Sequence, residues 1–152
     1  VKGAPEIILA QSEHVMEQGK AVKFKDDTRQ QFERKFITLS EKGLRIIGLA
    51  YKHAGEAKTV EEAGVNDLVF VGYVGIKYPL RPQAKQTVAA CKRAGIRMVM
   101  ITGDHKLTAK AVAQELGIPV DQPHSILEGF ELDKMSQYDF NQIVQEVSVY
   151  AG

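Results

Sequence analysis

Met98-Val99-Met100-Ile101-Thr102-Gly103-Asp104 is the stretch of sequence that decides the fold of this chain. Its apolar run is typical of a buried strand, and the hydroxyl, glycine and carboxylate that follow are typical of a turn into a helix. A helix N-terminus offers unpaired N–H groups and a partial positive charge, so a phosphoryl group can bind there while Thr102 donates to it. The alternative is structural: Asp104 only caps a helix over residues 105–116, which is worth about 1 kcal/mol.

Around this stretch, helices alternate with strands. The pattern predicts helices over residues 82–94, 105–116 and 138–144, and strands over residues 96–101, 125–127 and 147–150. Such alternation favours a parallel sheet with right-handed crossovers, which binds ligands at the carboxyl ends of its strands. Residues 102–104 lie at such an end.

The first half of the chain predicts a second sheet-and-helix region. Expected helices cover residues 5–12 and a long segment from Asp26 or Asp27 to Gly43, and expected strands cover residues 21–24, 44–51 and 68–76. The long helix is amphipathic, and its expected inner side carries Phe32, Phe36, Ile37 and Leu39. A polar connector over residues 52–67 is expected to hold one helical turn at Glu61.

Two prolines separate these halves. Pro79 and Pro82 stand within four residues and forbid both a continuous strand ladder and a helix interior. We therefore expect a first domain over residues 1–77, a hinge over residues 78–82 and a second domain over residues 83–152.

Composition excludes several classes of protein. The 152 residues carry a net charge of +1, which argues against a general nucleic-acid or anionic-membrane surface. A hydrophobic share of 44% with 26% charged residues is that of an ordinary globular protein, and no apolar run is long enough to span a bilayer.

The single Cys91 is expected to be a buried thiol on a helix. The histidines show no metal-ligand spacing, so no metal site is expected.

Three segments in this order resemble P-type cation-transporting ATPases. They are Lys2-Gly3-Ala4-Pro5-Glu6, Pro79-Leu80-Arg81-Pro82 and Ile101-Thr102-Gly103-Asp104, supported by Gly43-Leu44-Arg45. The resemblance implies a fold of class α/β, in which part of a nucleotide-binding domain precedes part of a Rossmann-like, haloacid-dehalogenase-type phosphorylation domain. It also implies a parent enzyme on the cytoplasmic face of a membrane that hydrolyses ATP through an aspartyl phosphate and transports a cation, weakly suggested to be calcium.

The resemblance assigns roles to particular residues. Lys2 and Gly3 would line the adenosine pocket, and Arg45 would reach toward the phosphates. Thr102, Gly103 and Asp104 would support the phosphorylation site, with Arg81 on the stiff hinge nearby. Alternatives stay open: Lys2 can be an exposed terminal lysine, Arg45 can form a surface ion pair, and Arg81 can be a simple hinge residue.

The chain also departs from the family pattern. Tyr78 stands where family members usually carry Asp, which puts the hinge hydrogen bonds in doubt. No Asp-Lys-Thr-Gly segment supplies a nucleophile, and no Gly-Asp-Gly-x-Asn-Asp segment supplies carboxylates for Mg²⁺. We therefore interpret the chain as an excised fragment that is inactive by itself and binds ATP weakly at most.

Two other functions are compatible with part of the sequence. A haloacid-dehalogenase-like phosphatase needs an Asp-x-Asp pair ahead of Thr102, and the sequence has none. A stand-alone α/β nucleotide-binding or protein-interaction module would explain the missing nucleophile but not residues 2–6. The expected partners are ATP, the rest of the parent with its actuator domain and membrane helices, and a second copy paired through exposed sheet edges.

Overall fold

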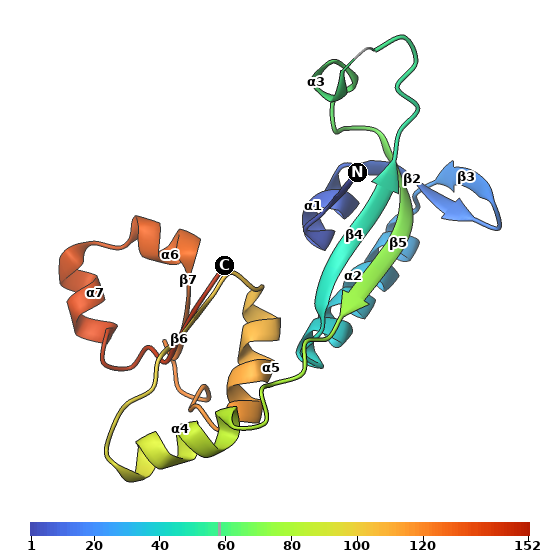
Figure 1. Cartoon of the computed structure of the whole chain (residues 1–152). Coiled ribbons are helices and arrows are strands. Elements are labelled where there is room, and N and C mark those ends of the chain that lie inside the picture. Colours follow the sequence, from blue (N-terminus) through green and yellow to red (C-terminus); the bar gives the residue numbers. More distant parts are fainter. Residues whose placement is uncertain (58) are drawn as a thin grey trace. The chain divides into compact units, whose positions relative to one another are not determined.

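The structure is a computed structural model that describes residues 1–57 and 59–152 (Figure 1). It divides into two compact units, the first made of Val1–Leu39 and Ile46–Ile76 and the second of Ser40–Arg45 and Lys77–Gly152. Both units are mixed α/β. Within the described residues, none of the helices combines the length and the apolar character that crossing a bilayer requires.

The first unit is built on a five-stranded sheet with the strand order β1-β4-β5-β2-β3. Its strands are β1 (Lys2–Gly3), β2 (Ser12–Glu17), β3 (Lys20–Lys23), β4 (Arg45–Tyr51) and β5 (Leu68–Ile76). Its helices are α1 (Pro5–Ala10), α2 (Asp26–Glu41), which ends beyond the unit's boundary, and α3 (Val60–Ala63). The hairpin β2–β3 and the pair β1–β4 are antiparallel, whereas β2 and β5 run parallel.

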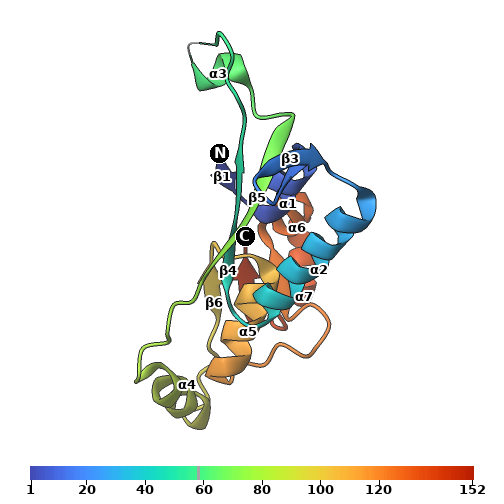
Figure 2. The same cartoon turned by 90° about the vertical axis from the view of Figure 1, so that its right-hand side faces the viewer.

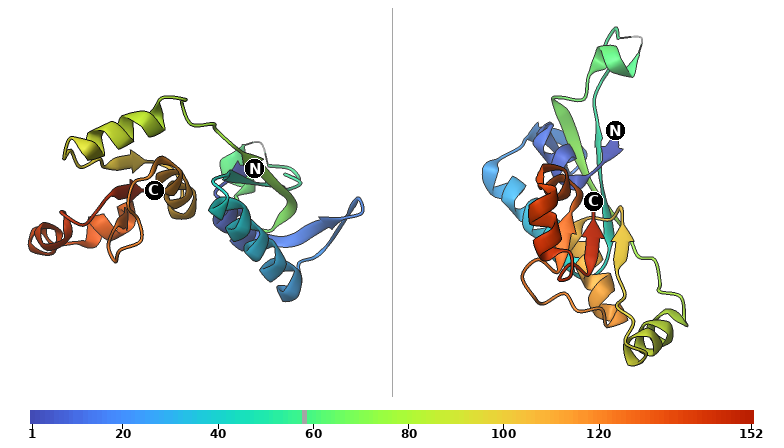
Figure 3. Two further views of the ribbon diagram at one scale, coloured as in Figure 1. Left: turned by 90° about the horizontal axis from the view of Figure 1, so that it is seen from below. Right: turned by 90° about the vertical axis from the view of Figure 1, so that its left-hand side faces the viewer.

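Helices α1 and α2 pack on the same face of this sheet, as Figure 2 and the left view of Figure 3 also show. Leu68 and Phe70 of β5 are fully buried there, with Ile8 and Leu9 of α1 beside them. Phe32 of α2 meets Phe70 edge-on, with ring centroids 4.9 Å apart. Aromatic side chains bury large apolar areas, so this cluster supplies most of the unit's hydrophobic stabilisation.

The close approach of α1 depends on a glycine in β4. A Cβ at Gly48 would lie 3.0 Å from Cβ of Ile8 and 3.2 Å from Cα of Pro5. Any side chain at this position would therefore push the helix away from the sheet. Gly48 thus identifies the face of β4 that α1 covers.

A second glycine changes which residues of β5 face the helices. Phe70 and Tyr73 are three residues apart, yet their rings are packed together at 5.1 Å. Strict alternation would put them on opposite faces, but Gly72 between them has a φ of 152°, which L side chains rarely adopt. Val71 and Val74 are exposed as a result.

The second unit holds a three-stranded parallel sheet with the order β6-β8-β7. The strands are β6 (Met100–Thr102), β7 (Ile126–Glu128) and β8 (Val149–Ala151), and the helices are α4 (Ala84–Arg93), α5 (Lys106–Leu116), α6 (Gly129–Lys134) and α7 (Gln137–Ile143). Figure 1 shows α6 next to β7. The parallel sheet predicted for this half is therefore confirmed, although its strands are short.

The core of the second unit consists of small side chains. Ala109 and Ala113 of α5 pack against Val149 and Ala151 of β8, and all four are almost completely buried. Small residues on both elements let a helix lie close to a sheet.

Several expected boundaries are wrong. The helix expected over residues 5–12 ends at Ala10, because β2 begins at Ser12 and pairs with β5, a partner more than 50 residues away. The strand expected over residues 96–101 forms a ladder only over residues 100–102, where β8 lies beside it. Helix α6 was not predicted.

Other sequence predictions agree with the structure more closely. Strand β5 covers the predicted residues 68–76, and Gly43 follows α2 with a φ of 75°. The turn expected at Glu61 is α3, whereas Lys58 of the same connector lies outside the described residues. Ile37, expected on the inner side of α2, is 42% exposed, and the predicted buried Cys91 is only half-buried.

Candidate functional site

The turn at residues 102–104 lies at the carboxyl edge of the parallel sheet. Thr102 is the last residue of β6, and it stands in register with Ala151 of β8, which in turn pairs with Glu128 of β7. The three strands therefore end together, and the turn leads from this edge into α5. Gly103 is exposed, and a Cβ built on it would meet no atom within 4 Å. The turn is thus open to a ligand.

Hydrogen bonds inside the turn hold Thr102 and Asp104 together. The Thr102 hydroxyl donates to the Asp104 carboxylate over 3.0 Å and accepts from the Asp104 backbone N–H over 3.1 Å. The backbone carbonyl of Asp104 also accepts from the N–H of Gly152, over 3.1 Å. A hydroxyl has one proton, and that of Thr102 is engaged in the hydrogen bond to the Asp104 carboxylate. Donation to a phosphoryl oxygen therefore requires the hydroxyl to rotate away from Asp104.

The N-cap of α5 is not Asp104. The helix begins at Lys106, and its N-cap is His105, whose Nδ1 accepts from the backbone N–H of Leu107 over 3.2 Å. Asp104 is therefore one residue outside the cap, and the N-cap interpretation of Asp104 is wrong. Its carboxylate is left to interact with the turn instead.

Lys106 joins the start of α5 to the end of β7. Its ammonium lies 3.0 Å from the Glu128 carboxylate and 3.7 Å from that of Glu131. Hydrogen bonding to Glu128, opposed by partial burial and aided by the charges of both carboxylates, raises the pKa of Lys106. Sequence reasoning missed this cluster, although Glu128 and Glu131 have the spacing of a capping box, which the structure contains.

Arg45 forms an ion pair with Asp104 inside the second unit. The guanidinium lies 3.8 Å from the carboxylate, and the two side chains are 56% and 32% exposed. At this distance and exposure the pair contributes under about 1 kcal/mol. The pair is therefore too weak to hold Arg45 permanently at Asp104.

Unlike Arg45, Arg81 forms no ion pair with Asp104 within the part of the chain that the structure describes. Its side chain is exposed, and no hydrogen bond or ion pair of its guanidinium is recorded among residues 1–57 and 59–152. Its backbone carbonyl accepts from the N–H of Ala84 at the start of α4, over 2.9 Å. Arg81 thus lies inside the proline segment, three residues before the first residue of α4.

Strand register places Lys2 and Arg45 on one face of the first sheet. Lys2 stands opposite Leu49 of β4, and Arg45 is four residues from Leu49 along the same strand. Residues with even spacing share a face, and the intervening Gly48 faces α1, so Lys2 and Arg45 point to the uncovered face.

The side-chain position of Gly3 faces α1 and not the face on which Lys2 lies. A Cβ at Gly3 would lie 3.5 Å from Ile8, which is ordinary contact, so the packing of α1 does not by itself require glycine here. Gly3 pairs with Gly48 in the register of β1 and β4.

The described residues do not form a metal site. No group of three or more His, Cys, Asp or Glu side chains within residues 1–57 and 59–152 is arranged to hold a metal ion. Mg²⁺ prefers several oxygen ligands, and Asp104 is a single carboxylate already engaged by Thr102. The chain alone therefore does not fit Mg²⁺.

Comparisons with known proteins place these segments in context. Residues 1–83 match a family model described as the P-type ATPase, cytoplasmic domain N. The chain is 36% identical over 152 residues to a calcium-transporting ATPase of Bacillus subtilis, covering 99% of this chain and 17% of that protein. It is 37% identical over 152 residues to calcium-transporting ATPase PAT1 of Dictyostelium discoideum and 35% identical over 151 residues to plasma membrane calcium-transporting ATPase 4 of Bos taurus. Those matches cover 99% and 95% of this chain, and 14% and 12% of the two proteins.

Proposed function

Because the chain belongs to the P-type ATPase family, we propose that it is a cytoplasmic part of a membrane enzyme that couples ATP hydrolysis to cation transport. The observation that carries this proposal is the family match over residues 1–83. The chain spans less than a fifth of the length of the relatives named above. Those relatives are named as calcium transporters, which supports calcium as the transported ion.

Strand β1 and the first residue of β4, Arg45, would contribute to the nucleotide site. Lys2 supplies a compact positive charge and Arg45 a planar donor, the two kinds of group that phosphates favour. Their shared, uncovered face of the sheet supports this role. Gly3 follows Lys2 in β1 and would contribute its backbone only, since its side-chain position faces α1. ATP would lie across this face, with Arg45 toward the phosphates.

The second unit would support the phosphorylation site, in a domain of the haloacid-dehalogenase type. The open carboxyl edge of its parallel sheet, with the turn over residues 102–104, supports that assignment. On release from Asp104, the Thr102 hydroxyl would donate to the transferring phosphoryl group, and Asp104 would orient the turn. Arg81 would lie on the hinge over residues 78–82.

Essential chemistry would come from elsewhere in the parent. The aspartyl nucleophile and the carboxylates for Mg²⁺ are outside the present sequence, so the isolated chain is expected to bind ATP weakly and not to hydrolyse it. Mg²⁺ would neutralise phosphate charge when the other ligands are present.

A titration of the isolated chain with ATP tests the nucleotide site. NMR chemical-shift changes at Lys2, Gly3 and Arg45 should saturate with a Kd of about 1 mM, equivalent to about −4 kcal/mol. Lys2→Met and Arg45→Met should each weaken binding at least threefold, whereas Lys20→Met on β3 should leave it unchanged. Equal binding by all four proteins would remove both residues from the site.

The parent enzyme provides the decisive test of the function. Full-length protein in sealed vesicles should accumulate calcium in the presence of Mg²⁺ and ATP and should form an acid-stable phosphoenzyme. Arg45→Met in the parent should raise the KM for ATP more than it lowers kcat. Failure to form the phosphoenzyme under any cation would contradict the proposed activity.

We also propose that the isolated chain pairs with a second copy through β6. This strand is at the edge of its sheet, and its central Ile101 is 80% exposed. An exposed apolar edge is a template for strand pairing. Sedimentation should show a concentration-dependent dimer that Ile101→Lys abolishes, while Tyr138→Lys at another exposed position should not; a monomer at high concentration would exclude the pairing.

A further inference from the structure

Thr108 of α5 donates its hydroxyl to a carbonyl that is remote in the sequence. The residue is 4% exposed, and its Oγ1 lies 3.0 Å from the backbone oxygen of Leu44, which directly precedes β4. A threonine inside a helix can instead turn its proton back to the carbonyl four residues earlier. Thr38 of α2 and Thr87 of α4 do so, over 3.0 and 3.1 Å. Thr108 therefore uses its proton to hold a separate segment of the second unit.

The residue before Leu44 also contacts α5. A Cβ built on Gly43 would lie 3.6 Å from Cβ of Ala111, which is three residues beyond Thr108. Gly43 has a φ of 75°, which glycine adopts readily, so the chain can turn after α2 and then lie against α5. Residues three apart on a helix share a face, so Thr108 and Ala111 contact the same segment. The main chain at residues 43 and 44 is thus fixed against the helix.

Arg45 directly follows this main chain, and its side chain is held much less firmly. The guanidinium lies 3.8 Å from the Asp104 carboxylate, and both side chains are partly exposed, so the ion pair is weak. The hydrogen bond at Thr108, by contrast, is donated by a buried side chain and involves no charge. The guanidinium can therefore leave Asp104 for another anion while the Leu44 carbonyl stays on Thr108.

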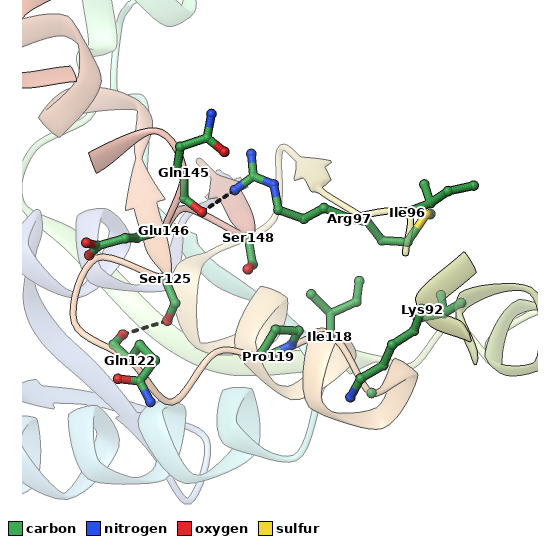
Figure 4. A pocket seen from close by; sticks show the side chains of 13 residues that line it. Lys92, Ile96, Arg97, Ile118, Pro119, Gln122, Ser125, Gln145, Glu146 and Ser148 are labelled. Carbon is green, nitrogen blue, oxygen red and sulfur yellow. Dashed lines mark hydrogen bonds between the residues drawn. The ribbon is translucent and has the colours of Figure 1, made fainter. Parts of the chain in front are cut away.

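Arg97 of the same unit shows the opposite arrangement. It lines a cavity of about 290 Å³ at the amino edge of the parallel sheet, before the strands begin (Figure 4). Its guanidinium donates to the backbone carbonyls of Val144, Gln145 and Val147, and Figure 4 shows the bond to Gln145. These bonds commit the guanidinium of Arg97 to the protein itself, whereas the single partner recorded for that of Arg45 among residues 1–57 and 59–152 is Asp104.

We propose that Thr108 is a positioning residue for the nucleotide site, because its bond to the Leu44 carbonyl keeps the Arg45 guanidinium beside the turn over residues 102–104. The inference rests on the proposed role of Arg45 toward the phosphates of ATP. Phosphate oxygens would replace Asp104 at the guanidinium, and the main chain before Arg45 would already be in place, which lowers the entropic cost of binding. Thr108 itself is buried and would touch neither the nucleotide nor the phosphoryl group.

Relaxation of ¹⁵N in the complete 152-residue chain without nucleotide tests the anchor. Thr108→Val removes the hydroxyl at nearly constant volume, and the backbone order parameters of Leu44 and Arg45 should fall below the value of about 0.85 that is typical of rigid backbone. Thr108→Ser keeps a hydroxyl and should keep both values. Thr87→Val is the matched control, since the Thr87 hydroxyl bonds within its own helix.

Thr108→Ala is the second variant if Thr108→Val does not fold, because alanine also lacks the hydroxyl and favours a helix. Unchanged order parameters at Leu44 and Arg45 in a variant without the hydroxyl would overturn the anchor, whatever the affinity of the chain for ATP.

A titration of the same proteins with ATP tests the positioning role. Thr108→Val should weaken binding about threefold, as expected for the loss of one hydrogen bond, whereas Thr108→Ser and Thr87→Val should leave it unchanged. In an Arg45→Met background, Thr108→Val should cause no further loss, because the guanidinium that it positions is absent. Equal losses in the two backgrounds would overturn the positioning role. An unchanged chain that does not bind ATP would refute the nucleotide site and this role with it, while the relaxation data would still decide whether Thr108 fixes Arg45.

Discussion

The two units are stabilised by different kinds of core. In the first unit, Phe24, Phe32 and Tyr73 surround Phe70, with ring centroids 5.8, 4.9 and 5.1 Å from it. In the second unit, the buried cluster is built from Ala, Val and Ile side chains around α5 and β8. Large aromatic side chains stabilise a sheet that helices cover on one face, whereas small side chains let a helix start close to the ends of short parallel strands. The aromatic core and the open carboxyl edge of a parallel sheet thus belong to different units.

The largest effect is expected in the aromatic core. Phe70→Ala should reduce the free energy of unfolding of the first unit by about 3–5 kcal/mol, because it removes a ring at the centre of three aromatic contacts and leaves a cavity. Urea unfolding followed residue by residue by NMR measures this for each unit. Phe130→Ala, at a ring that is 58% exposed, should change stability by less than about 0.5 kcal/mol. Comparable losses in the two variants would refute the assigned importance of the aromatic cluster.

The turn over residues 102–104 should respond less strongly. Thr102→Val removes both hydrogen bonds to Asp104 and should destabilise the turn by about 1–2 kcal/mol. Faster hydrogen exchange at the Asp104 amide is the measurement. Thr87→Val is the control, because the Thr87 hydroxyl donates only to an exposed helix carbonyl. An unchanged exchange rate at Asp104 would show that these hydrogen bonds do not hold the turn.

Tyr73 allows a stabilising change in the first unit. Its hydroxyl is buried without a hydrogen-bond partner among the described residues, and burial, followed by the charges of Glu33 and Glu6, raises its pKa. Tyr73→Phe should therefore increase the free energy of unfolding by about 1 kcal/mol at neutral pH. Chemical unfolding at pH 7 measures this gain, and a loss of stability would reveal a partner for the hydroxyl.

The same residue gives the first unit a pH dependence. The folded pKa of Tyr73 lies above the unfolded value of 10.0, so its contribution to stability is complete below pH 10 and is lost as the pH rises further. The loss of stability above pH 10 should be smaller in Tyr73→Phe than in the unchanged chain. Tyr51→Phe is the control, and equal pH profiles for all three proteins would contradict the assignment.

The smallest effect is expected for Lys106. Lys106→Met should destabilise the second unit by about 0.5 kcal/mol, because the ammonium and its carboxylates are partly exposed to solvent. The folded pKa is raised above 10.5, so this contribution is present at neutral pH and disappears as the pH rises above that value. Lys110→Met on the same helix should show no such alkaline change. A loss of several kcal/mol would mean that the cluster controls the fold of the unit.

Local patterns predicted many elements of both units. Strand β5 is a long apolar run and was predicted to the residue, and α2 shows acidic residues at its start and Gly43 after its end. These features depend on neighbouring residues alone. Strand β2 was missed because Ser12–Glu17 has few apolar residues, and its pairing with β5 joins segments far apart in sequence.

The candidate sites also combine features that the local sequence predicts with features that it does not. Thr102 and Gly103 were identified from the apolar strand that precedes them, and the structure places them at an open sheet edge. The ion pairs of Lys106 and the change at Gly72 in which β5 residues face the helices were not predicted. The Lys106 ion pairs join α5 to residues about 20 positions away, whereas the change in β5 depends on the φ of 152° that Gly72 adopts.

The order of helices and strands, the parallel sheet after the two prolines and the family resemblance follow from the amino-acid sequence itself, because short-range periodicity and contiguous motifs encode them. Tertiary structure alone decided that His105 and not Asp104 caps α5, that the Thr102 proton is engaged by Asp104, and that a cavity forms before the strands. The cavity depends on segments that are remote along the chain, and no local pattern specifies their distances. The two hydrogen-bond outcomes join residues only two positions apart, and they depend on backbone and side-chain conformations that the residue types alone leave open.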